Sequence, residues 1–545
     1  MADPQPPQSL QPEHAGLALR RDVTVWGSYM WGYADVGADI YTALGLVVAS
    51  AQGAANLAFG LAGLVYIMIG LCYTELAAAY PVAGGGHYFT LRGLGDLGGF
   101  VAGTALLLDY TIDIALFAVA SAGYLNFFTP YLFGMHARAV VLHLGPLKLQ
   151  WLWLLESSAL IALLVWLNIR GIRESSMLNE VLGLIDICTE SAIIVLGFVF
   201  AFKPELLVHQ WRHEFPTLHH FMYGSSLAII SFVGLESISQ AAQETRRPAT
   251  IIPRTSLTLI FTVFIFALAF STLTLGVMPW RTVPIDDPVA HLAHRIPYAG
   301  LVAGPFAAIL GATILLISAN SGVMSVSRLT FSMSQLRLAT RWLDAVHPRY
   351  RTPYRAILLF SFIGWLETFL SFLTPSAMDT LGNMYAFGAT LGYLLVFVSL
   401  IVLRVTDPYT PRPYRMPFNL PIRIGGRRVQ FPVLGVIGML GVGLILFEVI
   451  LTHKIGRIAG PAWVGISFLY YLWFRRQQKL PVLGSIAHDW EAEQRRVLQE
   501  AEEFELLEDY NTALAQRDRL RGINAERHGH GPAPLPPTSS PRSNR

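Results

Sequence analysis

The sequence predicts an all-α, polytopic membrane protein with twelve transmembrane helices. Only 14% of its 545 residues are charged, whereas soluble proteins average about 25%. Hydrophobic residues make up 53% of the chain and the mean hydropathy is +0.47. Apolar runs of about 20 residues, the length needed to cross the bilayer core, recur along the chain.

The spans are bounded by Gly, Pro or charged residues. They are expected near 23–48, 55–80, 97–127, 151–170, 176–202, 221–244, 255–278, 299–336, 354–373, 379–404, 431–452 and 458–476. The connecting loops are short, which excludes a large soluble domain. Most Lys and Arg fall in loops that face the cytoplasm if both termini do, so we expect N-in, C-in topology in the plasma (inner) membrane.

The same reading divides the chain into four parts. Residues 1–22 form a cytoplasmic segment without the apolar core of a cleavable signal. Residues 23–404 form a ten-helix core, and 405–480 contain the last two spans with their preceding loop. Residues 481–545 form a cytoplasmic tail, in which His488 to Arg521 predicts a solvated amphipathic helix and 528–545 a disordered end.

Two aspartates, Asp35 and Asp39, lie among glycines in the first predicted span. Lipid offers no partner to an ionised carboxylate, so such residues normally face a cavity or the bundle interior. A helix broken here would leave backbone N–H and C=O groups free at membrane depth, which is tolerated only where they line a cavity. The first span is therefore a candidate binding site.

The sixth span repeats the pattern, because Gly234 and Glu236 place a glycine beside an acid in mid-membrane. Spans one and six are five apart. Interrupted helices at corresponding positions of two five-helix halves predict an inverted-repeat transporter with a site at the bilayer midplane. Glycines that only allow close helix packing are the alternative, but packing does not explain the paired acids.

Several motifs then resemble one family. They are YTELAAAYPVAGGGHY (residues 73–88), GIRES (171–175), FVGLE (232–236), ETRRP (244–248), IPR (252–254), Ser327-Arg328 and Thr352-Pro353. Their combination, over roughly residues 20–476, resembles the amino acid-polyamine-organocation (APC) superfamily. The resemblance implies a LeuT-like fold of ten core helices in two inverted repeats with broken helices 1 and 6, plus two extra helices.

By the same resemblance, the site lies between the unwound parts of spans one and six, against spans three and eight. The expected substrate- or ion-binding residues are Asp35, Gly37, Ala38, Asp39, Tyr41, Asp109, Tyr110, Asp113, Ser231, Phe232, Gly234 and Asn320. Amino-acid members usually read Gly-Ser-Gly at the first break, where bare N–H groups receive the substrate carboxylate. An ionised Asp39 would instead repel a carboxylate by more than about 1 kcal/mol if water is excluded.

Acids dominate the ionisable groups of the spans. Asp109 and Asp113 share one face of the third span, and Asp186 and Glu190 share one face of the fifth, because each pair is four residues apart. Uncompensated carboxylates in a low-dielectric site require protons, metal cations or a cationic substrate. We expect Asp35, Asp109 and Asp186 to be coupling residues, with H+ as the coupling ion or another monovalent cation in its place.

Other candidates have weaker support. Glu75 and Arg328 lie near predicted cytoplasmic ends and are gate candidates, although ordinary interfacial pairing explains them equally well. Phe232 is a candidate lid over the site, as the resemblance implies. Asn320 could supply oxygen to a cation, whereas hydrogen bonding between helices is the commoner role of such a side chain.

The predicted function is secondary active transport of amino acids or related organic cations and amines. Asp35 with Tyr41, and Asp109 with Tyr110, also resemble the Kup and Kim type potassium importers, so a proton-coupled potassium importer is the alternative. A non-transporting nutrient sensor is a third possibility. No enzyme motif, nucleotide-binding loop, cofactor or metal site is expected. The expected partners are the lipid bilayer and a small substrate, without nucleic acid, and a homodimer is compatible with the sequence.

Overall fold

The structure is a computed structural model. It describes residues 24–82, 84–135, 140–144, 147–170, 175–240, 242, 245–350, 352–424, 427–453 and 455–520. The predicted N-terminal segment 1–22, the motif positions 171–174 and 244, and the predicted disordered end 528–545 lie outside these residues.

Long helices occupy the first half of the chain. They are α1 (Val25–Val36), α2 (Asp39–Ala51), α3 (Ala55–Ala79), α4 (Gly86–Leu125), α6 (Trp151–Arg170) and α7 (Ser175–Phe200). A short 3-10 turn, η1 (Gln52–Ala54), joins α2 to α3. The short helix α5 (Thr129–Phe133) and an antiparallel hairpin, β1 (Leu142–Leu144) and β2 (Leu147–Leu149), lie between α4 and α6.

The rest of the chain is also mainly helical, with more interruptions. Its elements before the hairpin are α8 (Pro204–His213), α9 (Leu218–Leu227), η3 (Ala228–Phe232), α10 (Glu236–Gln240), α11 (Pro248–Val277), η5 (Trp280–Thr282), α12 (Pro288–His294), α13 (Gly300–Gln335), η6 (Arg341–Asp344), α14 (Tyr354–Ser371) and α15 (Ala377–Thr406). The antiparallel hairpin β3 (Asn419–Ile424) and β4 (Arg427–Pro432) then leads to α16 (Val433–Thr452), α17 (Gly456–Gln477), α18 (Trp490–Glu500) and α19 (Phe504–Leu520).

Within the described residues, nine helical stretches are long and apolar enough to cross a membrane. The first, Val25–Ala79, covers two of the predicted spans. Helices α14 and α17 match predicted spans but are not among the nine, because charged residues such as Glu367 and Arg475 lower their mean hydropathy. A multi-pass membrane protein is therefore supported, whereas the count of twelve spans and the inverted repeat stay predictions.

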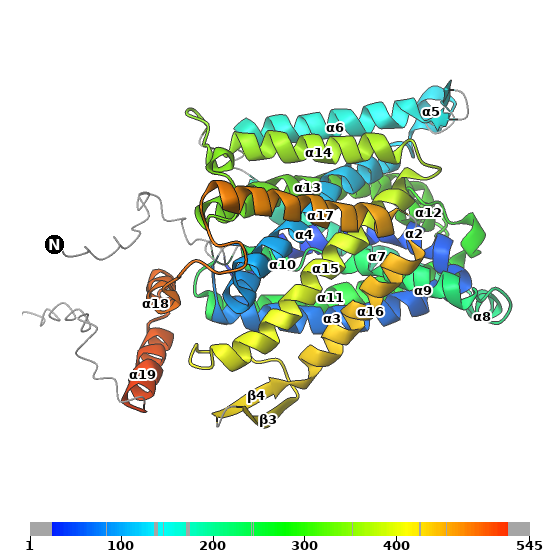
Figure 1. Cartoon of the computed structure of the whole chain (residues 1–545). Coiled ribbons are helices and arrows are strands. Elements are labelled where there is room, and N and C mark those ends of the chain that lie inside the picture. The colour runs from blue at the N-terminus through cyan, green and yellow to red at the C-terminus, as the bar shows by residue number, and fades with distance from the viewer. Residues whose placement is uncertain are drawn as a thin grey trace, which may run out of the picture.

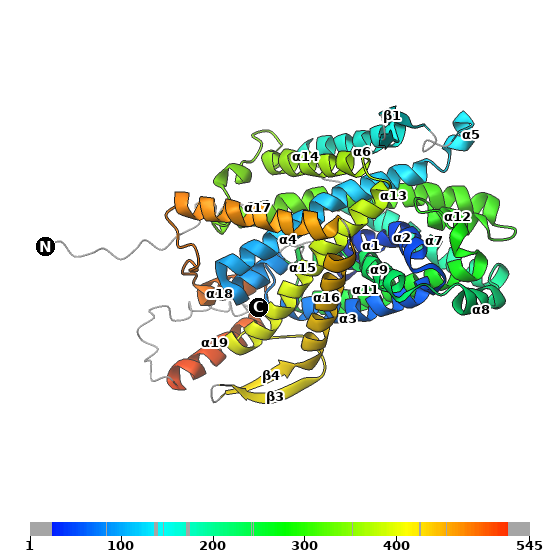
Figure 2. The same ribbon diagram turned by 45° about the vertical axis from the view of Figure 1, so that its right-hand side comes forward.

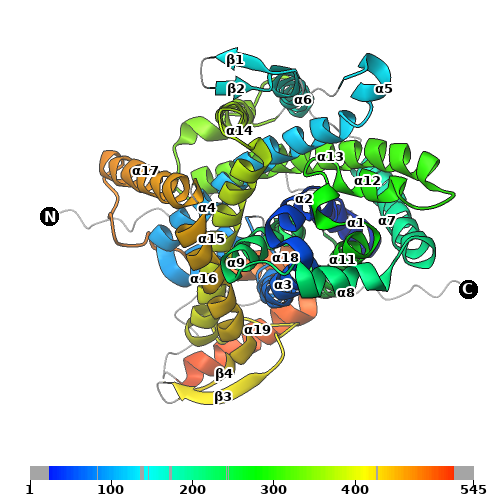
Figure 3. The same cartoon turned by 90° about the vertical axis from the view of Figure 1, so that its right-hand side faces the viewer.

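The long helices form one bundle with α1 and α2 at its centre (Figures 1 and 3). Helix α4 packs along α13 and α15, and α11 packs along α3. Helices α6 and α14 pair at one edge of the bundle, whereas the β3–β4 hairpin projects from the opposite side (Figure 3). Side chains of α2 are almost all buried, which explains how acids of the first span can avoid lipid.

The tail departs from the expected solvated helix. Two helices, α18 and α19, replace the single one predicted over His488 to Arg521, and residues 501–503 separate them. Helix α18 buries Gln494, Val497 and Leu498. The prediction of a solvated helix is wrong for α18, because a short apolar face lies among its charged residues, and Leu498 of that face packs against Tyr510 and Leu514 of α19.

A buried ion pair ties the end of α3 to the end of α15. The Arg404 guanidinium donates from Nε to Glu75 Oε1 at 2.7 Å, and both side chains are at most 3% exposed. The second Glu75 oxygen accepts the backbone N–H of Met416 at 2.8 Å. Glu75 therefore fixes α3 against both α15 and the loop that follows it.

Replacing Glu75 by Ala should lower the stability of the solubilised protein by about 3–5 kcal/mol, because Arg404 would remain buried without a counter-ion. The transition temperature measured by fluorescence-detected size exclusion would report the loss. The matched control is Glu500→Ala, which removes an ion pair whose two side chains are 56% and 51% exposed and should change little. Equal transition temperatures for both variants would contradict the role of Glu75.

Candidate functional site

The first predicted span is interrupted between α1 and α2. The two connecting residues, Gly37 and Ala38, keep right-handed helical dihedral angles, with φ of −63° and −60°. The N–H of Gly37 still donates to Tyr33 at 2.7 Å, and the N–H of Tyr41 bonds to the carbonyl of Ala38 at 3.1 Å. The expected unwinding is therefore limited to a tightened turn, and an extended break at this position is not seen.

The sixth predicted span has a true break. Helix α9 tightens into η3, the backbone is extended at Val233, and a new helix, α10, starts at Glu236. Gly234 has φ of +104°, in the left-handed region that other residues rarely adopt. Space is also tight, since a Cβ atom would lie 3.1 Å from the Asp35 carboxylate.

Asp35 lies where the first and sixth spans meet. It belongs to the last turn of α1, and α1 packs against both α10 and α13. Ser237 of α10 and Ser321 of α13 lie beside its carboxylate. Asp35 lies at the junction of these three helices and is partly exposed.

Four further carboxylates gather around Asp35. They are Asp39 of α2, Asp109 and Asp113 of α4, and Glu236 of α10, and each is at most 7% exposed. Asp39 interacts electrostatically with all of the other four. We call these five residues the acid cluster, and four of them are members of the predicted site.

The acid cluster has no basic partner among the described residues. None of its members forms an ion pair, and no Lys, Arg or His interacts with them electrostatically. Both carboxylate oxygens of Asp39 and of Asp109 are buried without a hydrogen-bond partner. Burying charge without a partner is very costly, so the cluster must hold protons or a bound cation.

Tyrosines of α15 border the acid cluster. The Tyr393 hydroxyl donates to Glu236 at 3.1 Å, and Tyr385 hydrogen-bonds Asp113. Sequence reasoning missed both hydroxyls. Gly388 was a usable signal, because a Cβ atom there would lie 3.1 Å from the backbone nitrogen of Asp109.

The α7 acids form a second, separate pair. Tyr41 donates to Asp186 at 2.8 Å, and the hydroxyl of Tyr33 donates to Glu190. One oxygen of each carboxylate is buried without a partner. The structure thus turns Tyr41 toward α7, so that neither Tyr41 nor Asp186 joins the acid cluster.

Two other predicted residues also contact different neighbours. Phe232 stacks on Tyr66 of α3, with ring centroids 4.8 Å apart. The Asn320 side chain accepts a hydrogen bond from Asn168 of α6 at 2.6 Å, which is the interhelical role weighed above. Their expected contact with substrate stays a prediction.

The remaining candidates are buried near the acid cluster or lie at the end of the bundle. The Ser231 hydroxyl is buried without a hydrogen-bond partner beside the sixth-span break. Tyr110 is 3% exposed and interacts with Glu236 and Asp109. Of the gate candidates, Glu75 pairs with Arg404 rather than with Arg328, so their gating role stays a prediction.

Known transporters have sequences similar to this chain. A family model described as "Amino acid permease" matches residues 25–469. The branched-chain amino acid permease BcaP of Bacillus subtilis is 27% identical over 85% of this chain and 95% of its own length. The methylthioribose transporter of the same organism is 24% identical over 87% and 98%. Human cationic amino acid transporter 4 is 28% identical over 69% of this chain and 59% of its own length.

Replacing Gly234 by Ala should disrupt the sixth-span break. A Cβ atom at φ of +104° is strained and also meets the Asp35 carboxylate, so we expect a loss of about 1–3 kcal/mol. Gly465→Ala in α17 is the control, because a Cβ atom there meets nothing within 4 Å. Thermal unfolding of the two variants in detergent would test this, and an unchanged Gly234→Ala protein would contradict the strained geometry.

Proposed function

This chain belongs to the amino acid permease family, and on that premise we propose that it is a secondary transporter of amino acids or related organic cations and amines. The carrying observation is the acid cluster, whose five carboxylates have no basic partner among the described residues. Transport is coupled to protons or to another monovalent cation. In the alternative, the protein exchanges one cargo for another, which needs no net ion flow.

The charge of the acid cluster favours a positively charged cargo. A cation that binds at Asp35 would lose hydrating water and contact carboxylate oxygens instead. The charge-assisted hydrogen bonds that form are about twice as strong as neutral hydrogen bonds. Asp35 is the partly exposed member, so cargo would meet it first. A substrate carboxylate, in contrast, would be repelled by Asp39, which lies one residue beyond the Gly37-Ala38 turn.

The acid cluster also suits proton coupling. Cargo and protons can neutralise the same carboxylates, so the binding of one changes the affinity for the other by thermodynamic linkage. Asp109 and Asp113 lie on the same face of α4 and interact directly with each other. Two such carboxylates share protons rather than ionise independently, which supports Asp109 as a coupling residue.

Asp186 of α7 is the coupling candidate that lies outside the acid cluster. Its hydrogen bond with Tyr41 links it to the first span, so Asp186 can respond to movement of that helix.

Relatives do not decide the cargo, because the cargoes in their names differ. One is a branched-chain amino acid permease, one a methylthioribose transporter and one a cationic amino acid transporter. Potassium is the second candidate. The free carboxylate oxygens of Asp39 and Asp109 favour it, since hard cations bind through several oxygen ligands.

Uptake into proteoliposomes would separate these cargoes. Vesicles would receive a mixed pool of labelled amino acids and polyamines, or labelled rubidium as a potassium analogue, with and without an imposed pH gradient. We expect uptake of a cationic organic compound that increases with the gradient. Uptake of rubidium alone would reject the permease proposal, and binding without uptake would reject transport.

Replacing Asp35 by Asn should lower gradient-driven accumulation by more than about tenfold, the loss expected when a charge-assisted contact is removed. The control is Glu367→Gln in α14, which removes a carboxylate that bonds Thr111 outside the acid cluster. Both variants should reach the membrane in parental amounts, as measured by quantitative blotting. Undiminished accumulation in Asp35→Asn would overturn its assigned role.

A further inference from the structure

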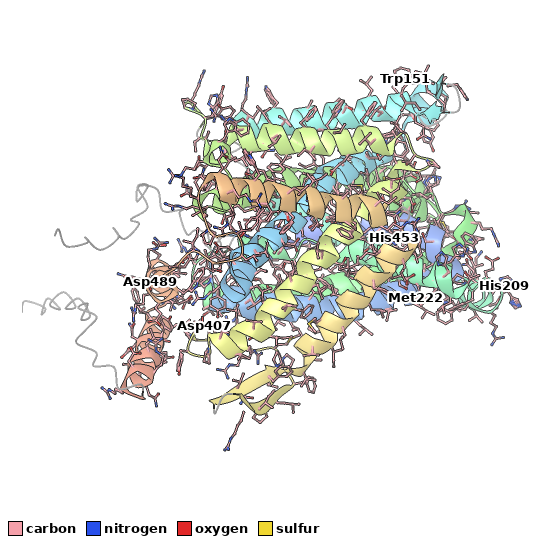
Figure 4. The ribbon with its side chains drawn as sticks, in the orientation of Figure 1. Trp151, His209, Met222, Asp407, His453 and Asp489 are labelled. Carbon is pink, nitrogen blue, oxygen red and sulfur yellow. The ribbon has the colours of Figure 1, made fainter. Side chains whose placement is uncertain are left out.

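We infer that the C-terminal segment 485–520 is a built-in clamp, which docks on one end of the bundle and holds that end closed. We call it the clamp segment. It lies beyond residues 25–469, over which the family match extends. Its two helices lie at the bundle end opposite α8 and α12 (Figures 1 and 2). Asp489, which precedes α18, is at the same end as Asp407 of the loop after α15, whereas His453 and Met222 lie toward the other end (Figure 4).

The clamp segment first binds the start of α4. The Asp96 carboxylate forms a buried ion pair with Arg475 of α17 and also accepts the backbone N–H of Ile486 at 3.0 Å. The backbone N–H of Asp96 donates to the Ser485 hydroxyl at 3.3 Å. Gly95 has φ of +77°, and a Cβ atom there would lie 2.3 Å from that hydroxyl. The backbone of α4 is thus shaped to receive this part of the chain.

Helix α18 then covers the connection between α3 and α4. Gln494 is 1% exposed. Its amide donates to the Ala79 carbonyl at the end of α3 at 2.9 Å and accepts from Arg92 of α4 at 3.0 Å. Tyr88 donates to Glu493 at 3.2 Å. One side chain of the tail therefore bonds both helices where the chain reverses through Gly84 and Gly85, each of which has positive φ.

The clamp segment also reaches the second half of the chain. Glu503, between α18 and α19, accepts the backbone N–H of Ala249 in the first turn of α11 at 3.2 Å. Helix α19 packs Tyr510 and Leu514 against Tyr409, in the loop that follows α15. The segment is therefore fixed to α3 and α4 on one side and to α11 and the end of α15 on the other.

These contacts have a mechanical consequence. Helices α3, α4, α11 and α15 surround the central α1 and α2 (Figure 3), so this end opens only if they separate. Hydrogen bonds are lost when donor and acceptor separate by about 1 Å beyond contact. Opening must therefore break several hydrogen bonds of the clamp segment at once. A tail that stayed in solvent would have no such bonds to break. The clamp segment thus biases the equilibrium toward the closed end, and its release raises the population that is open.

A cysteine already present in α3 can report this opening. Cys72 is 1% exposed and lies two turns before Ala79, with its sulfur 3.9 Å from the carbonyl of Val396 in α15. In a Cys188→Ser background, the rate of Cys72 alkylation by a membrane-permeant maleimide measures how often α3 and α15 separate. This readout needs no knowledge of the cargo, so it does not depend on the proposed function.

Gln494→Ala should speed Cys72 alkylation about tenfold, because it removes one buried and one partly buried hydrogen bond of the clamp segment. Arg496→Ala is the matched control in the same helix, since its side chain is 56% exposed and its ion pair is with Glu500 of the same helix. The control should leave the rate unchanged. An unchanged rate in Gln494→Ala, or equal acceleration in both variants, would overturn the inference.

A second variant guards against misfolding. Glu503→Ala removes a contact at α11 instead of α3 and should also speed alkylation, with parental size-exclusion profiles. A parental alkylation rate in Glu503→Ala would likewise count against a docking role.

Discussion

The structure depends on the cost of placing five carboxylates inside a membrane protein with no basic partner among the residues that the structure describes. Lipid could not stabilise this charge, and four of the five carboxylates are buried away from water. The chain instead gathers Asp35, Asp39, Asp109, Asp113 and Glu236 at the contact of three spans. Whatever neutralises them must come from outside the protein, and that requirement connects the fold to the movement of protons or cations.

Each of the surrounding helices contributes a different part of the site. The first span supplies two carboxylates on either side of a tightened turn, and the sixth supplies a backbone break at Gly234. Helix α4 contributes a rigid face with Asp109 and Asp113, while tyrosines of α15 donate to two members of the acid cluster. At one end of the bundle, Glu75 and the clamp segment join helices whose separation would expose this site.

The sequence predicted much of the fold, because long apolar runs allow few structures in a bilayer. Every predicted span range contains helix, and four of the five carboxylates of the acid cluster were predicted site residues. The first-span break was overestimated, since glycines and acids indicate a polar environment but do not fix dihedral angles. Tyr41 was assigned to the site by its resemblance to potassium importers and Asn320 as an oxygen donor, but the directions of both side chains depend on the helices α7 and α6 that pack beside them.

Composition and spacing by themselves determined that this chain crosses the membrane repeatedly, carries acids at membrane depth and interrupts its sixth span. Hydrophobicity and helical periodicity are local properties, so they can be read along the chain. Only the tertiary structure decided which acids share one site, that Glu75 pairs with Arg404, and that a charged tail docks through Gln494. Those outcomes depend on contacts between residues hundreds of positions apart, which local patterns do not encode.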